Sequence, residues 1–269
     1  MSIHNFNSKN KSCQFSLSEN ITFGKNIVFG PNCKNITIGY GCFLGNDLYI
    51  DVPELVIGDY TTIHHGTIIH GLKTHIGHNC WIGHYCIIDS LGGDTIIGNN
   101  VGVGAHSQLW SHMKFGDLLE GCLWNSTGKL HLKDDVWLVG HTIIGPITAE
   151  AKSMLLTGGV MMKNMKANQI YSGNPAVQLE KLGTQFTTLS IDDKKLQFIN
   201  LIDQFQRENY LNNATQFEVV DSFSKTKFLN GITQFNLIER TYLPQYSHSE
   251  YKLMKFLLYD KAKFIPVSI

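Results

Sequence analysis

The sequence predicts a mainly β protein, in which a coil of short parallel strands is followed by a smaller α+β extension. Two observations lead to this fold class. Aliphatic residues recur every six positions through much of the first 176 residues, and this recurrence stops at Val177, where the composition shifts to Gln, Lys, Phe and Tyr. A period of six fits neither an amphipathic helix nor a simple alternation, but it fits a short strand followed by a corner.

The composition is that of a globular protein without a strongly charged partner. The chain has 269 residues, of which 43% are hydrophobic and 16% charged, so it can bury a full core. Its 22 basic and 22 acidic residues give a net charge of zero. Nucleic-acid and anionic-membrane binding both need a basic surface, so we expect neither.

The sequence shows no targeting or membrane-spanning segment. Residues 1–20 contain no apolar run of a secretory peptide, and we expect them to form an N-terminal cap segment. No later stretch reaches the roughly 18 apolar residues that span a bilayer. The six cysteines form no CxxC pair, so we expect free thiols and a cytoplasmic location.

The six-residue period defines which side chains should point into the core. We expect the first residue of each repeat to point inward, the second, mostly Gly, to take a positive φ at the corner, and the fifth, such as Cys80 or Cys86, to be a small core filler. The predicted first positions are Ile21, Ile27, Ile38, Leu44, Ile50, Ile57, Ile63, Ile69, Ile76, Ile82, Ile88, Ile97, Val103, Leu109, Leu132, Leu138, Ile144, Leu156 and Met162.

One long interruption divides the repeats. After Leu109 the next repeat should begin at position 115, but it begins at Leu132, so about residues 113–131 form an excursion loop. Insertions in a repeat protein leave the stacked core and often carry function. We interpret the excursion as a lid over a cleft, the alternative being a variable surface loop.

The repeats end in a specific closing run. From Asp134 to Ala176 the chain reads DDVWLVGHTIIGPITAEAKSMLLTGGVMMKNMKANQIYSGNPA. Together with the period, this run resembles the hexapeptide-repeat acyltransferases of the sugar O- or N-acetyltransferase type. The resemblance covers about residues 21–176 and implies a left-handed parallel β-helix with three repeats per coil, the handedness coming from the family alone.

The resemblance also implies a catalytic base. In that family a single His follows a segment like IGNNVGVGAHSQLWSH, on the loop that leaves the coil, and here that residue is His112. An imidazole suits removal of a proton from a hydroxyl or amine near neutral pH. His106 is the competing candidate. The other histidines at corners have a structural interpretation, because His tolerates the turn.

Acetyl-CoA is the implied acyl donor, and a sugar or nucleotide sugar the implied acceptor. By local match, the cofactor-binding residues are Gly140, Thr157, Met162 and Lys163. The acceptor-side candidates are Tyr85, Asp89, His106, Trp110 and Asp117. Two positions depart from the family pattern, because Val177 stands where a basic residue commonly meets the nucleotide phosphate and Tyr85 where an acceptor-binding Asn is common.

A zinc-dependent hydrolyase of the carbonic anhydrase type is the alternative function. That class uses the same coil and three histidines across a subunit boundary, and His70, His106 and His112 could supply them. We prefer the transferase, because inserted residues between His70 and His106 should spoil their stacking, and we assign no metal ligand. In both cases a flat-sided prism needs a neighbour to form a site, so we expect a homotrimer.

Residues 177–269 should form the α+β extension. We expect helices over 189–212 and 247–263, and strands over 217–223 and 232–242. Ser190 and Asp192 are candidates for the first helix cap. The expected apolar faces are Leu196, Ile199, Leu201, Ile202 and Phe205 in the first helix and Tyr251, Met254, Leu257 and Leu258 in the second.

Overall fold

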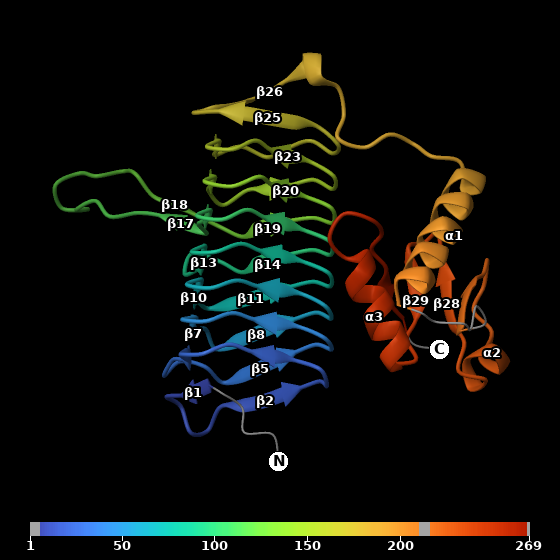
Figure 1. Ribbon diagram of the computed structural model, residues 1–269. Coiled ribbons are helices and arrows are strands. Elements are labelled where there is room, and N and C mark those ends of the chain that lie inside the picture. Colours follow the sequence, from blue (N-terminus) through green and yellow to red (C-terminus); the bar gives the residue numbers. More distant parts are fainter. Residues whose placement is uncertain (1–5, 210–215, 268–269) are drawn as a thin grey trace. The chain divides into compact units, whose positions relative to one another are not determined.

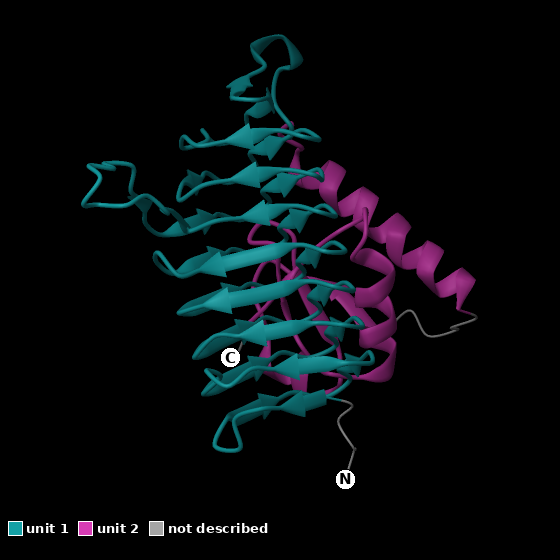
Figure 2. Cartoon of the chain, turned by 90° about the vertical axis from the view of Figure 1, so that its left-hand side faces the viewer, with its two compact units in different colours: residues 1–186 teal, residues 187–269 magenta. Residues whose placement is uncertain are grey.

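The computed structural model describes residues 6–209 and 216–267 (Figure 1). The chain divides into two compact units, Met1–Phe186 and Thr187–Ile269 (Figure 2). None of the helices in the described ranges is long and apolar enough to cross a membrane.

Three parallel sheets form the first unit, and each is a ladder of short strands. Sheet A contains β1 (Phe6–Ser8), β4 (Ile27–Phe29), β7 (Tyr49–Asp51), β10 (Ile68–Gly71), β13 (Ile87–Ser90), β16 (Gln108–Leu109), β21 (Ile143–Ile144) and β24 (Val160–Met161). Sheet B contains β2 (Gln14–Leu17), β5 (Asn35–Ile38), β8 (Glu54–Ile57), β11 (Lys73–Ile76), β14 (Thr95–Ile97), β19 (Leu130–Leu132) and β22 (Thr148–Ala149). Sheet C contains β3 (Thr22–Phe23), β6 (Phe43–Leu44), β9 (Thr62–Ile63), β12 (Trp81–Ile82), β15 (Gly102–Val103), β20 (Trp137–Leu138), β23 (Met154–Leu155), β25 (Ile170–Gly173) and, antiparallel at its end, β26 (Ala176–Gln178).

Successive strands of the chain belong to sheets A, B and C in turn, so every three strands complete one coil. In sheet A, for example, Ile69 lies beside Ile50 of the preceding coil and Ile88 of the next. Figure 1 shows these coils stacked on one another. We call the turn from sheet C to sheet A the entry corner and the turn from sheet A to sheet B the exit corner.

The aliphatic residues at the predicted first positions fill the interior of the coil. From Ile27 to Ile144 those first positions are buried to 1% exposure or less. The last two predicted first positions are wrong by one residue, because Leu155 and Met161 are buried whereas Leu156 is half-buried and Met162 exposed. The cause is a repeat of five residues between Ile144 and Ala149, which pairs with Leu132 in sheet B.

The recurrence of glycine after the inward aliphatic residue has a different cause from the one predicted. Positive φ falls two residues later than expected, for example at Asn79, Asn100 and His106. The glycine after each aliphatic residue is needed because the next coil lies against it. A Cβ on Gly77 would stand 2.6 Å from the carbonyl oxygen of Gly98.

The small fifth positions are core fillers, as predicted. Cys80 and Cys86 are buried, and the Cys80 Sγ lies 3.0 Å from the carbonyl oxygen of Gly98. Burial raises the pKa of the Cys86 thiol to about 11, so the thiol stays protonated and unreactive at neutral pH. All six cysteines are free.

The coil extends beyond the predicted limits of 21 and 176. β1 and β2 pair with β4 and β5, so the predicted cap segment contributes the first strands, although its residues 1–5 lie outside the described ranges. At the other end, Phe186 exchanges two hydrogen bonds with the Asn168 side chain, at 2.8 and 2.9 Å. These bonds tie the segment after β26, including the 3₁₀ turn η1 (Glu180–Leu182), to the first unit.

The second unit is an α+β fold. Its sheet has the order β27 (Phe217–Val219), β28 (Thr233–Asn236), β29 (Thr241–Leu243) and β30 (Ile265–Pro266). Its helices are α1 (Ile191–Glu208), α2 (Lys225–Leu229) and α3 (His248–Leu257). Phe198 of α1 packs against Phe235 of β28, with ring centroids 5.1 Å apart, so α1 covers this sheet.

The predicted elements of the second unit are only partly right. Ser190 caps α1 by accepting a hydrogen bond from the Asp193 amide, as expected, while residues 210–212 of the predicted helix lie outside the described ranges. Leu196 and Ile199 are exposed, because Phe198 takes the buried face instead. The strand predicted over 232–242 is a hairpin of β28 and β29, and α2 and β30 were not predicted.

Candidate functional site

His112 lies at the root of the excursion, at the exit corner. β16 ends at Leu109, and His112 then begins β17 (His112–Met113), which pairs antiparallel with β18 (Ser126–Thr127). We call residues 113–129 the arm; it projects from the stack of coils (Figure 1). The coil resumes at Leu130, one residue before the predicted end of the excursion.

A buried carboxylate holds His112. Asp89 of β13 has no exposed surface, and its Oδ1 lies 2.8 Å from His112 Nδ1. The same oxygen accepts hydrogen bonds from the Ser111 amide at 3.0 Å and the Ser111 hydroxyl at 2.7 Å. Oδ2 accepts from the Leu91 amide at 3.0 Å. The carboxylate is therefore surrounded by donors and fixed in one orientation.

The electrostatics of Asp89 define the tautomer of His112. Burial acts to raise the Asp89 pKa, but the hydrogen bonds from Ser111, Leu91 and His112 outweigh it and hold the pKa below its usual value. An ionised carboxylate only accepts hydrogen bonds, so His112 Nδ1 must be the donor. Nε2 of the neutral ring then carries the lone pair, as a general base requires.

Gly92 makes room for this arrangement. Its amide donates to the Ser111 hydroxyl at 2.8 Å. A Cβ at this position would lie 2.3 Å from the Ser111 carbonyl oxygen and 2.7 Å from the His112 Cβ. Only glycine therefore lets the loop after β13 lie directly against the residues that lead into the arm.

Two further side chains surround the dyad of Asp89 and His112. The Trp110 ring lies edge-on to His112, with centroids 6.1 Å apart, and its Nε1 donates to Gln108 Oε1 at 3.1 Å. His70 lies on the other side of the carboxylate, with Nε2 3.8 Å from Asp89 Oδ2. The His70 and His112 side chains are 29% and 21% exposed, so both can meet a ligand while Asp89 cannot.

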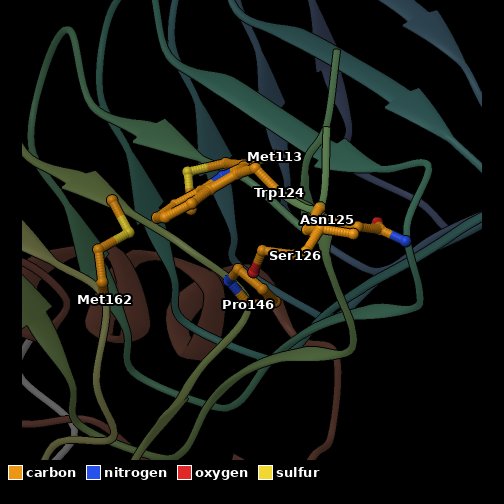
Figure 3. Close-up of a pocket in the computed structure, with 7 residues that line it drawn as sticks. Met113, Trp124, Asn125, Ser126, Pro146 and Met162 are labelled. Atoms are coloured by element: carbon orange, nitrogen blue, oxygen red, sulfur yellow. The ribbon is translucent and has the colours of Figure 1, made fainter. Parts of the chain in front are cut away.

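A pocket opens at the base of the arm, and Met113, the residue after His112, is part of its lining. Its volume is about 380 Å³, and it is lined by Met113, Leu123, Trp124, Asn125, Ser126, Pro146 and Met162. Figure 3 shows Met162 and Trp124 among the side chains that line this space. Met162 thus faces a ligand-sized pocket, and Lys163 follows it on the exposed surface.

Other predicted residues lie at the entry corner. The Tyr85 ring stacks on His106 with centroids 5.3 Å apart, and His106 stacks on His141 at 4.9 Å. Gly140 precedes His141, and its carbonyl accepts a hydrogen bond from the Gly158 amide, which follows the exposed Thr157.

The predicted site residues are therefore divided between two edges of sheet A. His106 and His112 lie on opposite ends of β16 and are six residues apart, a separation of at most roughly 20 Å. Gly140 and Thr157 lie on the entry side, and Met162 and Lys163 on the exit side. A single chain does not bring the two groups into one compact site.

Three sequence-based expectations need correction. Asp89 does not offer its carboxylate to an acceptor, because it is buried and used by Ser111, His112 and Leu91. Asp117 accepts the Leu119 amide at 2.8 Å and so closes a turn of the exposed arm, away from the dyad. The excursion was expected to lie over a cleft as a lid, but it projects from the stack of coils (Figure 1) and borders the pocket at its base.

The proposed zinc trio also does not form within one chain. His70 and His112 flank Asp89 near the exit corner, while His106 stacks at the entry corner. Sequence reasoning did not single out Ser111 or Gly92. Their contacts with Asp89 and His112 depend on the register between neighbouring coils, for which the local sequence carries no signal.

Comparisons with known proteins give two kinds of likeness. No family model matches the chain. The chain is 27% identical over 179 residues to the mitochondrial gamma carbonic anhydrase 2 of Arabidopsis thaliana, covering 65% of this chain and 52% of that protein. Gamma carbonic anhydrase 1 of the same plant is 26% identical, with 69% and 56% covered. The chain thus spans about half the length of these curated relatives.

Acyltransferases are among the solved structures to which the chain is similar. One is the polysialic acid O-acetyltransferase OatWY, with 16% identity, a TM-score of 0.46 and coverage of 70% of this chain and 94% of that one. Another is a hexapeptide-repeat acetyltransferase of Vibrio cholerae O1 biovar eltor in complex with acetyl coenzyme A, with 18% identity, a TM-score of 0.36 and coverage of 53% and 69%. Likenesses at these scores leave the function to be argued from the site itself.

Proposed function

We propose that the chain is an acetyl-CoA-dependent acetyltransferase that acetylates a hydroxyl or amine of a sugar, in a nucleotide sugar or a surface polysaccharide. The observation that carries the proposal is the hydrogen bond between His112 Nδ1 and the buried Asp89 at the root of the arm, where the next residue, Met113, lines a pocket. The closing run from Asp134 to Ala176 supports the same function. A left-handed winding of the coil belongs to this proposal.

The dyad supplies the proton transfers that acyl transfer needs. His112 Nε2 takes the proton from the acceptor hydroxyl, or from the neutral acceptor amine, as the oxygen or nitrogen attacks the thioester carbonyl carbon. The new C–O or C–N bond forms, the C–S bond breaks, and the proton passes from His112 to the departing coenzyme A thiolate. Asp89 stabilises the imidazolium formed between these steps and holds the ring in place.

The split of the candidate residues favours a site between chains. The entry-side residues Gly140 and Thr157 would meet the exit-side residues Met162 and Lys163 of a neighbour if flat faces pack around a three-fold axis. Acetyl-CoA would then lie in the groove between two coils of a homotrimer. Use of acetyl-CoA also fits the cytoplasmic location predicted above.

Release of free coenzyme A thiol tests the proposal. The purified chain is incubated with acetyl-CoA and a panel of amino sugars, sugars and nucleotide sugars, and thiol release is followed for each acceptor. We expect acceptor-dependent release and a rise in Tm with acetyl-CoA, because a specific ligand stabilises the native state. If no acceptor class gave either thiol release or a rise in Tm, the transferase proposal would be wrong.

A zinc-dependent carbonic anhydrase is the second candidate, favoured by the identity with the two plant proteins. It would need His70 and His112 of one chain to combine with His106 of another, because one chain does not bring the three together. Hydration of CO₂ by the zinc-loaded protein, abolished in His70→Ala, would support it. If the protein hydrated CO₂ and released no thiol from acetyl-CoA, the transferase proposal would be wrong.

A further inference from the structure

Three histidines gather at the entry corner, apart from the dyad. His64 and His65 follow β9, and His84 follows β12 in the next coil. One potential ligand atom from each ring lies within 4.8 Å of the other two, the one such group found in the described part of the chain. The His64 ring centroid is 4.4 Å from that of His84.

His64 is half-buried, but both of its ring nitrogens are buried and have no hydrogen-bond partner in the described ranges. Its ring packs against Trp81, with centroids 4.3 Å apart. Burial, followed by the neighbouring His84 and His65, lowers its pKa to about 4, so the ring is neutral at pH 7. A buried polar group without a partner is costly, and a ligand that accepts a nitrogen lone pair would relieve the cost.

We propose that His64, His65 and His84 bind one divalent transition-metal ion that prefers imidazole ligands, such as Zn²⁺ or Co²⁺. Neutral imidazoles are ordinary ligands of these ions, with Zn–N distances of about 2.0–2.1 Å. The ligand atoms would close from within 4.8 Å to roughly 3.4 Å of one another. The site joins two successive coils and departs from the expectation that the chain has no metal ligand.

The three ligands should contribute unequally. His65 Nδ1 accepts a hydrogen bond from the Asn46 amide at 2.6 Å, so the proton of its neutral ring is on Nε2. Coordination by His65 therefore requires the ring to leave that hydrogen bond, which offsets part of the gain. His64 has no such commitment, so its removal should weaken binding the most.

The site is distinct from the proposed reaction centre. His112 lies at the exit corner, across sheet A from the entry corner that holds these three rings. The proposed base and its carboxylate supply no ligand to this ion. Metal binding and acetyl transfer can therefore be lost independently.

Titration of the metal-free, untagged full chain with Co²⁺ tests the proposal, read by the visible d–d absorption of the bound ion and competed with Zn²⁺. We expect saturation at one ion per chain. His64→Ala and His84→Ala should bind at least 100-fold more weakly, His65→Ala roughly tenfold more weakly, and His141→Ala, the matched control at the same corner, like the wild type. His64→Gln serves as the second variant if His64→Ala does not fold.

Two results would overturn the site: no saturable binding at one ion per chain, or unchanged binding in His64→Ala or His64→Gln together with His84→Ala. Circular dichroism of each variant shows that it is folded. Thiol release from acetyl-CoA, measured on the same samples, separates failure of this site from failure of the transferase proposal.

Discussion

Asp89 is the residue whose structural role differs most from its predicted one. It was expected to bind the acceptor, and it instead orients His112 from a fully buried position. We predict that Asp89→Asn lowers kcat by roughly 10²- to 10⁴-fold, because the fixed tautomer and the stabilised imidazolium are lost. The KM for acetyl-CoA should change little, since Asp89 cannot touch the cofactor.

Asp59→Asn is the matched control. Its carboxylate also accepts a backbone amide, from Tyr40 at 2.8 Å, and also lies near a histidine, His78, at 4.0 Å. This pair is remote from the arm, so kcat should stay at the wild-type value. Equal losses in the two variants would mean that Asp89 acts only through the stability of the coil.

The same carboxylate gives a pH-dependent contribution to stability. The pKa of Asp89 is lower in the folded chain than in the unfolded chain, so its stabilising effect is present above the unfolded value and is lost as the pH falls through the folded value. We predict that the difference in unfolding free energy between wild type and Asp89→Asn is larger at pH 7 than near pH 3. Urea unfolding at both pH values measures it, and a difference that does not shrink in acid would contradict the assignment.

At the scale of single residues, the sequence predicted His112 by its place after the repeat and before the excursion. It could not predict the partner of His112, because Asp89 meets Ser111 and His112, and Gly92 meets Ser111, only through the stacking of two coils. It likewise missed the contact of His64 with His84, which are 20 positions apart in the chain.

At the scale of the repeat, close contact between coils explains the recurrent glycine. We predict that Gly77→Ala lowers the unfolding free energy by about 1–3 kcal/mol, because the added methyl group would overlap the Gly98 carbonyl of the next coil. Gly128→Ala is the control, since its Cβ would meet only the Pro146 Cβ at 3.5 Å. Urea denaturation compares them, and equal stabilities would contradict this explanation.

The period predicted the elements of the coil well and those of the second unit poorly. A repeated inward residue is a strong signal because each coil stacks on the last, so even the shift to Leu155 and Met161 follows from one short repeat. The helix α1 has no such repetition. Its buried face is chosen by Phe198 packing on Phe235, a tertiary contact that the local pattern of Leu196 and Ile199 does not reveal.

For the whole molecule, the arm and the divided site both point to self-association. Large apolar side chains of the arm are exposed, namely Phe115, Leu118, Leu119, Leu123 and Trp124. Exposed apolar groups gathered on one segment are typical of an interaction surface. We predict a homotrimer, with a mass in light scattering of about three times the 30.2 kDa of one chain. A monomeric mass at micromolar concentration would contradict it.

If each site combines two chains, inactive variants should complement each other. Gly140→Trp would block the entry side and His112→Ala would remove the base from the exit side. Refolding the two together should restore part of the thiol release that each variant lacks alone. If mixed oligomers recovered no thiol release, the entry-side and exit-side residues would not belong to one shared site.

The central claim is that His112 is the base of an acetyl transfer, and the direct measurement is thiol release from acetyl-CoA by wild type and His112→Ala with the best acceptor. The account predicts a kcat lower by roughly 10²- to 10⁴-fold in His112→Ala, unchanged acetyl-CoA binding and an intact fold, with a smaller loss in His106→Ala. Full activity in His112→Ala would contradict it, whichever other histidine then proved to be needed.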